Sequence, residues 1–329
     1  MKRISLLATG GTIASIHSPS GLIPGVTARE LLERVPGLSE SAVISARDVF
    51  SLDSSNIQPE EWRVLARAAF DALNESDGVV ITHGTDTMAY SAAALSFMLR
   101  APRGPVVFTG SQLPLNHPLS DAASNLREAV EVARTAPAGV YVVFNHKIIH
   151  GARAVKLRTT SFDAFDSVNA LPVGFLDAEG AHYHGEPVLP HGEPALLDEL
   201  DPRVFLLKLM PGTAPEIFDW IAESGMRGVV LEAFGLGGLH YIRRNLVDKL
   251  KMLGSRGVCT LVTTQCMYEK TNFNIYEVGR NVLSNRVFSA HDMTSEAAVA
   301  KLMWVLGDSE NRLSLIEKNV CGEMQGRPE

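Results

Sequence analysis

The chain has 329 residues, of which 46% are hydrophobic and 20% are charged, a composition typical of a globular protein with length for two domains. Its formal net charge of −7 argues against nucleic acid or an anionic membrane as a partner. No apolar run approaches the roughly twenty residues that span a bilayer. Only a few apolar residues follow Met1-Lys2-Arg3, too few for the core of a signal peptide, so we expect a soluble cytoplasmic protein.

The first half of the chain alternates short apolar runs with segments of helical periodicity. The runs are mostly bounded by glycine or proline and predict strands, while apolar residues at helical spacing predict helices between them. Strands are expected at 4–9, 78–82, 105–109 and 139–144, and helices at 60–74, 87–99 and 119–133. This alternation predicts a parallel sheet with helices on both faces.

Prolines then interrupt the chain and mark an interdomain linker. They are Pro187, Pro190, Pro194 and Pro202. Beyond them the alternation resumes, with strands expected at 204–209, 228–231 and 258–263 and helices at 216–224, 245–255 and 295–306. We therefore expect an N-terminal catalytic α/β domain at 1–184, a linker at 185–203 and a smaller C-terminal α/β domain at 204–329.

Two threonine-bearing segments of the first half carry the chemistry. Thr12 follows Gly10-Gly11 after the first strand, and Thr85 follows His83-Gly84 after the second. Parallel strands end where a sheet opens into a ligand crevice, and glycines let a substrate approach the backbone. A paired-threonine site suggests covalent chemistry on a small amide. For the first segment alone, a tight turn or a phosphate-binding loop remain alternatives, although the third glycine and the Gly-Lys-Ser/Thr ending of nucleotide loops are missing.

A carboxylate and a lysine could complete such a site. Asp86 either caps the following helix or acts as a carboxylate that binds a substrate ammonium group or orients Lys156. Lys156 is either a solvated side chain or, drawn into a crevice beside Thr85, a group with a depressed pKa that serves in proton transfer. The residues by themselves leave both alternatives open.

Several ordered segments together resemble the signatures of the bacterial-type L-asparaginase family. The segments are 8–15, 53–56, 83–88, 109–114 and 151–165, and 53–56 with 264–267 is similar to the cytoplasmic type I branch. The likeness extends from the first strand to 321–324, nearly the whole chain. It implies a two-domain asparaginase/glutaminase-like α/β fold, with a larger N-terminal, mostly parallel sheet covered by helices on both faces and a smaller C-terminal α/β domain.

The resemblance also implies catalytic roles. Thr12 would be the nucleophile that takes the aspartyl group as an ester and releases ammonia. Thr85, Lys156 and Asp86 would form a relay, in which Thr85 assists proton transfer or activates the hydrolytic water. A threonine hydroxyl needs such help, because it is a poor nucleophile at neutral pH.

Substrate binding follows from the same resemblance. Asp86 would hold the α-ammonium group of the substrate, while Asp53, Ser54 and Ser55 would bind its α-amino and α-carboxylate ends. A zwitterionic amino acid needs both a carboxylate and hydroxyl or amide donors there. The chemistry requires no metal and no organic cofactor. Family members are homodimers or dimers of dimers (homotetramers), so a homo-oligomer is expected.

Two departures from the family pattern matter. Leu22 stands where many relatives carry a tyrosine that assists the nucleophile. Tyr276 matches a tyrosine of related type I enzymes and could assist Thr12 in its place. The alternative is that Tyr276 is a core or interface residue. The second departure concerns the allosteric asparagine site of some type I enzymes. Cys266 is present, but Val155 and Glu232 stand where the family has threonine and arginine. We therefore expect no cooperative activation by asparagine.

Metal and disulfide chemistry find little support. The three cysteines show no paired metal spacing, and reduced cysteines are expected. His182, His184 and His191 border the linker and could bind a metal, but no acidic or cysteine partner lies at suitable spacing. A surface loop is the favoured interpretation.

The leading hypothesis is hydrolysis of L-asparagine to L-aspartate and ammonia through a threonyl ester. A glutaminase or an enzyme of dual specificity is the nearest rival, since one methylene changes discrimination by only about 1–3 kcal/mol; the loop over 17–25 would decide it. The ammonia-producing component of a tRNA-dependent amidotransferase is disfavoured, because an extra N-terminal domain and a tRNA-binding surface would be expected. A non-catalytic amino-acid-binding protein is the remaining alternative.

Overall fold

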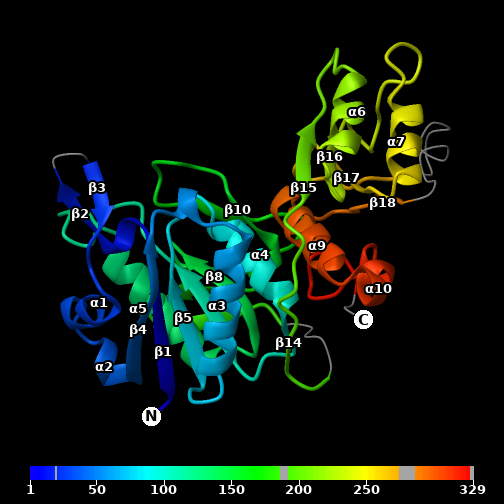
Figure 1. Ribbon diagram of the computed structural model, residues 1–329. Coiled ribbons are helices and arrows are strands. Elements are labelled where there is room, and N and C mark those ends of the chain that lie inside the picture. Colours follow the sequence, from blue (N-terminus) through cyan, green and yellow to red (C-terminus); the bar gives the residue numbers. More distant parts are fainter. Residues whose placement is uncertain (19–20, 186–191, 274–285, 327–329) are drawn as a thin grey trace. The chain divides into compact units, whose positions relative to one another are not determined.

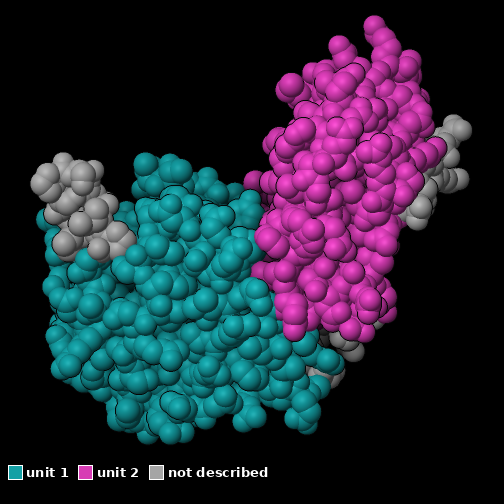
Figure 2. Space-filling view, in the orientation of Figure 1, with its two compact units in different colours: residues 1–198 teal, residues 199–329 magenta. Residues whose placement is uncertain are grey.

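The computed structural model describes residues 1–18, 21–185, 192–273 and 286–326, with the main chain alone for 16–18 and 21–24. It divides into two compact units, residues 1–198 and 199–329, which Figure 2 distinguishes by colour. Pro187, Pro190 and His191 lie outside the described residues. No helix in the described ranges is long and apolar enough to cross a membrane.

Unit 1 is built on an eight-stranded sheet in the order β13-β12-β9-β8-β7-β5-β1-β4. Figure 1 labels β8, β5, β1 and β4 of this sheet. The five strands from β4 to β8 run parallel, and β9, β12 and β13 are antiparallel. The bounds are β1 Arg3–Gly10, β4 Val43–Leu52, β5 Gly78–Thr82, β7 Pro105–Thr109, β8 Gly139–Phe144, β9 Lys147–His150, β12 Gly174–Asp177 and β13 Gly180–Tyr183. The strands expected at 78–82, 105–109 and 139–144 are confirmed.

The sheet is mostly parallel, as expected, and becomes antiparallel at one edge. There β8 and β9 form a hairpin whose two turn residues, Asn145 and His146, have φ values of 47° and 65°. Two left-handed residues in a row are typical of the type I′ turn, whose twist matches antiparallel strands. Helix α5 holds this turn, because the Asn125 side chain accepts from the Asn145 N–H at 3.1 Å and Glu128 accepts from the His146 N–H at 3.0 Å.

Helices cover both faces of the sheet. Alanines and Leu126 of α5 pack with Val80, Val107 and Val143 in one buried cluster. On the opposite face, Gly151 fits between Val140 and α4, and the Trp62 indole of α3 donates to Ser91 of α4 at 3.0 Å. The helices are α1 Ala28–Arg34, α2 Leu38–Ser41, α3 Pro59–Ala72, α4 Met88–Met98 and α5 Ala122–Thr135.

Three short two-stranded sheets complete unit 1. They pair β2 Ser15–Ser18 with β3 Gly21–Pro24, β6 Leu99–Arg100 with β14 Ala195–Leu196, and β10 Ala154–Lys156 with β11 Phe165–Ser167. None of the three was expected from the sequence, and β2 and β3 fall largely within the segment 17–25 that was expected to be a loop. The β10–β11 hairpin matters most, because it carries Lys156.

Unit 2 has a four-stranded parallel sheet in the order β15-β16-β17-β18. Its α6 and α7 pack on one face through Phe218, Ile221 and Leu250. Helix α9 lies on the other face, where Gly228 of β16 meets Leu302. The bounds are β15 Val204–Lys208, β16 Gly228–Ala233, β17 Cys259–Thr264, β18 Val287–Ser289, α6 Glu216–Glu223, α7 Leu246–Ser255, α9 Ser295–Gly307 and α10 Ser309–Arg312.

The C-terminal segment of unit 2 is held by a fully buried ion pair. Lys301 Nζ lies 2.6 Å from Glu323 Oε1 and donates to the Lys318 carbonyl at 2.5 Å. Glu323 also accepts from the backbone N–H groups of Val320 and Cys321. Each charge is therefore satisfied in the core, as burial of an ion requires.

Candidate active site

The candidate site lies where the connections of the large sheet diverge. The chain leaves β1 toward β4 at one edge, whereas it leaves β5 toward β7 in the opposite direction. The carboxyl ends of the adjacent strands β1 and β5 therefore flank a topological switch point, the usual position of a ligand crevice in such sheets. Thr12 follows β1 and Thr85 follows β5, as the sequence predicts.

Glycines let three loops meet at this point. A side chain on Gly11 would place its Cβ 2.4 Å from the Gly84 Cα, and one on Gly84 would come within 2.6 Å of Ser54. Gly11 also has a φ of +78°, in the left-handed region. The loops after β1 and β5 are thus in backbone contact, and the Ser54 side chain of the loop after β4 packs against Gly84, so the segments of Thr12, Ser54 and Thr85 lie together.

Thr12 is positioned by its backbone. It begins the short 3₁₀-helix η1, Thr12–Ala14, and is partly exposed. The preceding Gly11 N–H donates to the Leu52 carbonyl at 3.0 Å, and Ser15 Oγ donates to the Gly11 carbonyl at 2.8 Å. Within the described ranges no group forms a hydrogen bond with the Thr12 hydroxyl.

Thr85, Lys156 and Asp86 meet as a hydrogen-bonded cluster. Lys156 Nζ donates to Thr85 Oγ1 at 2.7 Å and to Asp86 Oδ1 at 2.7 Å. Thr85 is 6% exposed, whereas the Asp86 side chain is 63% exposed. The cluster therefore joins the buried hydroxyl of Thr85 to the carboxylate of Asp86, which is accessible to a ligand.

Gln112 is a further neighbour of Thr85. Thr85 Oγ1 donates to Gln112 Oε1 at 3.5 Å, and Gln112 Nε2 donates to the Ser161 carbonyl at 2.9 Å. The Gln112 backbone N–H is itself held by the Asp121 carboxylate at 3.0 Å. The sequence predicted no role for Gln112. It stood out only as part of the segment 109–114, which resembles the family.

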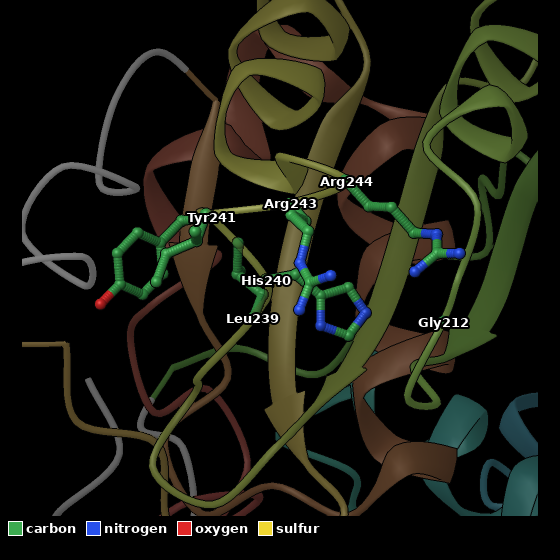
Figure 3. Close-up of a pocket in the computed structure, with 7 residues that line it drawn as sticks. Gly212, Leu239, His240, Tyr241, Arg243 and Arg244 are labelled. Atoms are coloured by element: carbon green, nitrogen blue, oxygen red, sulfur yellow. The ribbon is translucent and has the colours of Figure 1, made fainter.

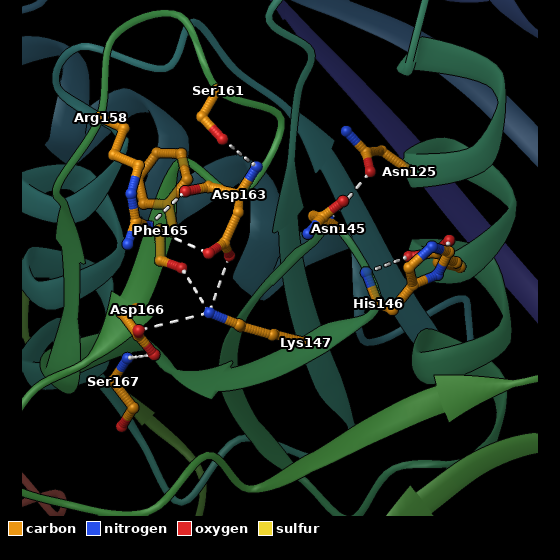
Figure 4. A network of polar contacts seen from close by, with 11 residues as sticks. Asn125, Asn145, His146, Lys147, Arg158, Ser161, Asp163, Phe165, Asp166 and Ser167 are labelled. Carbon is orange, nitrogen blue, oxygen red and sulfur yellow. Dashed lines mark hydrogen bonds and ion pairs between the residues drawn. The ribbon is translucent and has the colours of Figure 1, made fainter.

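Lys147 fixes the hairpin that carries Lys156 (Figure 4). Its ammonium lies 2.8 Å from Asp163 Oδ1 and 3.3 Å from Asp166 Oδ2, and it donates to the Phe165 carbonyl at 3.5 Å. Phe165 pairs with Lys156 across β10 and β11. A lysine outside the cluster thus anchors the strand that pairs with Lys156. This role of Lys147 was not predicted from the sequence.

Charge stabilises this anchor. Burial lowers the pKa of Lys147, but its contacts with Asp163 and Asp166 outweigh burial, and the pKa lies above its usual value. The pKa of Asp163 is lowered, chiefly by the hydrogen bond from Lys147. Arg158, which lies 3.0 Å from Asp163 Oδ2, adds to the same effect.

The loop after β4 contains the three residues expected to bind substrate. Asp53 caps the 3₁₀-helix Ser54–Asn56, and its Oδ1 accepts from the Ser55 N–H at 2.8 Å. The pKa of Asp53 is lowered by hydrogen bonds from the Ser55 side chain and backbone. Asp53 and Ser55 are exposed, whereas Ser54 is 3% exposed and its carbonyl accepts from Thr87 Oγ1 at 2.8 Å.

His83 supports the second loop from below. It is fully buried, and burial lowers its pKa to about 4, so the imidazole is uncharged at neutral pH. Its Nδ1 lies 2.7 Å from the Gly84 carbonyl oxygen and donates to it in the neutral tautomer that carries the ring proton on Nδ1. A neutral side chain thereby fixes the glycine that contacts Gly11.

The departures from the family pattern have different outcomes. Leu22 lies in β3 opposite His17 of β2, and Tyr276 lies outside the described residues. Val155 is buried in β10. In unit 2, Glu232 of β16 accepts from Ser295 Oγ at 2.6 Å. The absence of asparagine activation therefore stays a prediction, as does the group that assists Thr12.

The histidines near the expected linker have other partners. His182 Nε2 lies 2.9 Å from Asp177 Oδ1, and its ring stacks on Phe175 at 4.9 Å. The His184 ring also lies against Phe175. In the part of the chain that the structure describes, no group of three or more histidine, cysteine, aspartate or glutamate side chains is arranged to hold a metal ion.

Comparison with known proteins gives matches along almost the whole chain. Residues 3–189 match the family model "Asparaginase, N-terminal", and residues 203–317 match "Glutaminase/Asparaginase C-terminal domain". The chain is 41% identical over 329 residues to an L-asparaginase of Thermococcus kodakarensis, covering 98% of this chain and 99% of that protein. The solved structure of the thermostable L-asparaginase from this organism has a TM-score of 0.93, with 98% and 99% of the two chains covered.

Two further relatives mark the range of the likeness. A glutamyl-tRNA(Gln) amidotransferase component of Methanothermobacter thermautotrophicus is 37% identical over 339 residues, which cover 98% of this chain and 77% of that protein. The crystal structure of L-asparaginase I from Vibrio cholerae is 29% identical, with a TM-score of 0.85 and 99% of each chain covered.

Proposed function

The chain belongs to the asparaginase family and is an amidohydrolase, and from that premise we propose that it hydrolyses L-asparagine to L-aspartate and ammonia. The observation that carries this proposal is the cluster of Thr85, Lys156 and Asp86 beside the loop of Thr12. Similarity over the full length to the Thermococcus kodakarensis L-asparaginase supports the same substrate.

We propose Thr12 as the nucleophile. Its Oγ1 attacks the side-chain amide carbon of the substrate, the C–N bond breaks, and the hydroxyl proton passes to the departing nitrogen, which leaves as ammonia. An aspartyl ester on Thr12 remains. Backbone N–H groups of the glycine loops would stabilise the oxyanion of each tetrahedral intermediate, at about 3 kcal/mol per well-placed donor.

Water then hydrolyses the ester. The Thr85 hydroxyl, bound to Lys156, orients the water and passes its proton toward the Thr12 oxygen, which leaves the acyl carbon. Asp86 holds the Lys156 ammonium and, through its exposed carboxylate, binds the α-ammonium of the substrate. Asp53, Ser54 and Ser55 are the proposed contacts for the α-amino and α-carboxylate ends of the substrate. Asp53 and Ser55 are exposed, and the buried Ser54 side chain lies against Gly84.

Ammonia release tests the proposal. The purified protein receives L-asparagine and L-glutamine separately, and Thr12→Ala and Thr85→Ala are compared with Thr135→Ala, an exposed threonine of α5. Release from asparagine that falls at least about a hundredfold in the two loop variants and persists in Thr135→Ala is the expected result. Equal release in Thr12→Ala would exclude the threonyl ester.

Other members of the asparaginase family define the rival functions. Faster release from L-glutamine would favour a glutaminase or an enzyme of dual specificity. Tight binding of asparagine without release would favour a non-catalytic amino-acid-binding protein. The likeness to the glutamyl-tRNA(Gln) amidotransferase component favours a second candidate, an ammonia-producing protein that works with a partner; little release by the isolated chain would support it.

Assembly and location complete the proposal. We expect a homodimer or a dimer of dimers, in which Tyr276 assists Thr12, and sedimentation velocity would measure the assembly state. A cytoplasmic location agrees with the similarity to the type I branch of the family, and fractionation of cells that express the chain would test it.

A further inference from the structure

Unit 2 contains a basic cavity whose lining residues are not part of the candidate active site (Figure 3). Its volume is about 280 Å³. It is lined by Gly212, Leu239, His240, Tyr241, Ile242, Arg243 and Arg244. These residues lie between β16 and α7, apart from Gly212, which follows β15.

Positively charged side chains gather in this cavity. The Arg243 guanidinium lies beside the His240 imidazole, and the Arg244 side chain extends toward Gly212 (Figure 3). Among the residues that the structure describes, no carboxylate lines the cavity and none forms an ion pair with either arginine. Two guanidinium groups therefore face a concave surface of a chain whose net charge is −7.

His240 adds an unused polar atom. Its Nε2 is buried and has no hydrogen-bond partner in the described parts of the chain. Its ring packs against Phe234 at 5.7 Å, which fixes its plane. A buried polar nitrogen normally finds a partner, because leaving it without one costs about 1–3 kcal/mol.

Arg244 is held in a costly backbone conformation. Its φ is +52°, in the left-handed region that glycine and asparagine adopt most readily. Asn245, the next residue, caps α7 with its side chain and fixes the chain just beyond this position. A strained arginine whose guanidinium makes no described ion pair is better explained by a ligand than by stability.

We propose that this cavity binds a small oxyanion, a phosphate or carboxylate group. The guanidinium groups of Arg243 and Arg244 would each donate paired N–H bonds to the anion, the geometry in which arginine binds phosphate and carboxylate best. His240, with its proton on Nε2, donates a further bond. The open side at Gly212, where a Cβ would meet no atom within 4 Å, leaves room for entry.

Calorimetric titration of the full chain tests this site. Inorganic phosphate and succinate are titrated separately at constant ionic strength, since salt screens exposed charges. Wild type is compared with the double variant Arg243→Gln/Arg244→Asn, in which asparagine tolerates the left-handed backbone. Arg256→Gln, which removes an exposed arginine after α7, is the matched control.

The expected result is one saturable site per chain, at least about tenfold weaker in the double variant and unchanged in Arg256→Gln. Tighter binding of phosphate would identify a phosphate or phosphomonoester ligand, and tighter binding of succinate a free dicarboxylate; both support the site. The proposal is overturned if neither anion saturates at millimolar concentration, if the double variant binds as wild type does, or if Arg256→Gln loses as much. It is also overturned if the double variant changes only the sedimentation coefficient, because the arginines then meet a second copy of the chain.

Discussion

The two threonines of the crevice are held by different means. Thr85 is 6% exposed and accepts from Lys156, with Gln112 on its other side. Thr12 is partly exposed, and the contacts that fix its position are made by the backbone of Gly11. One hydroxyl is therefore set by charged and polar side chains, and the other by the path of the main chain.

This difference suggests a division of labour. A group that moves protons gains from partners fixed before the substrate arrives, because no reorganisation is then needed at the moment of reaction. A nucleophile must instead remain free to form a bond, so its position is best fixed from behind. Substitution of the polar side chains around Thr85 should therefore impair proton transfer. Substitution of the glycines that set the main-chain path should instead displace Thr12.

Removing the Lys156 ammonium should have the largest effect. In Lys156→Met the stem remains, but Thr85 and Asp86 lose their shared donor. We expect kcat for ammonia release from asparagine to fall by about 10²–10⁴, the range of a lost proton-transfer group. Lys249→Met, which removes an ion-paired lysine from unit 2, is the control and should retain activity. Comparable losses in both variants would contradict a special role for Lys156.

Adding a side chain where the two glycine loops touch should displace the loop that positions Thr12. In Gly11→Ala the new Cβ would meet the Gly84 Cα at 2.4 Å and the residue would keep a φ of +78°. We expect the free energy of unfolding to fall by about 3 kcal/mol and the activity to drop with it. Gly37→Ala is a matched control, since its φ is +87° but no atom lies within 4 Å; it should cost only about 1 kcal/mol. Equal melting temperatures for the two variants would show that the loop contact is unimportant.

Central strands of the large sheet could be predicted from the sequence, but the edges of that sheet could not. β5, β7 and β8 are buried on both faces and read as continuous apolar runs, so their bounds follow from the sequence. β4 was missed because it is an edge strand whose residues are all exposed or only partly buried, and because it includes the charged residues Arg47 and Asp48. The β8–β9 turn was missed because its left-handed residues are Asn145 and His146, without the usual glycine.

The site shows the same limit. Lys156 and Asp86 are 70 residues apart, and no periodicity links them; only resemblance to a family suggested that they meet. Gln112 and Lys147 act through contacts that exist only after the sheet and the β10–β11 hairpin have formed. Local patterns therefore predict which elements form, whereas the partners of each catalytic candidate depend on how those elements pack.

Gln112 offers a finer test of the Thr85 side. Because Lys156 donates to Thr85 Oγ1, the threonine proton must point elsewhere, and Gln112 Oε1 is the acceptor. In Gln112→Ala the hydroxyl can rotate, and we expect kcat to fall about tenfold with KM nearly unchanged, as for a lost hydrogen bond of about 1.4 kcal/mol. Gln112→Glu keeps an acceptor and should recover part of kcat. A rise in KM with constant kcat would instead indicate that Gln112 binds substrate.

The smallest expected effect concerns the anchor of the Lys156 hairpin. Lys147→Met removes ion pairs to Asp163 and Asp166 that are partly exposed, so we expect a loss of stability of up to about 1 kcal/mol. The lowered pKa of Asp163 means that its contribution is present above its ordinary value of 3.8 and is lost as pH falls through the lowered pKa. The raised pKa of Lys147 means that its contribution is present below 10.5 and is lost as pH rises through the raised pKa.

The difference in melting temperature between wild type and Lys147→Met should therefore be largest near neutral pH and shrink toward acid and strong alkali. Lys2→Met, which removes a more exposed ion pair with Asp77, should change the melting temperature less at every pH. Because Lys147 touches neither threonine, its effect on kcat can arise only through the hairpin that carries Lys156. A fall in kcat that follows the loss of stability would tie the Thr85 side to that anchor, whereas an unchanged kcat would show that β10 holds Lys156 without it.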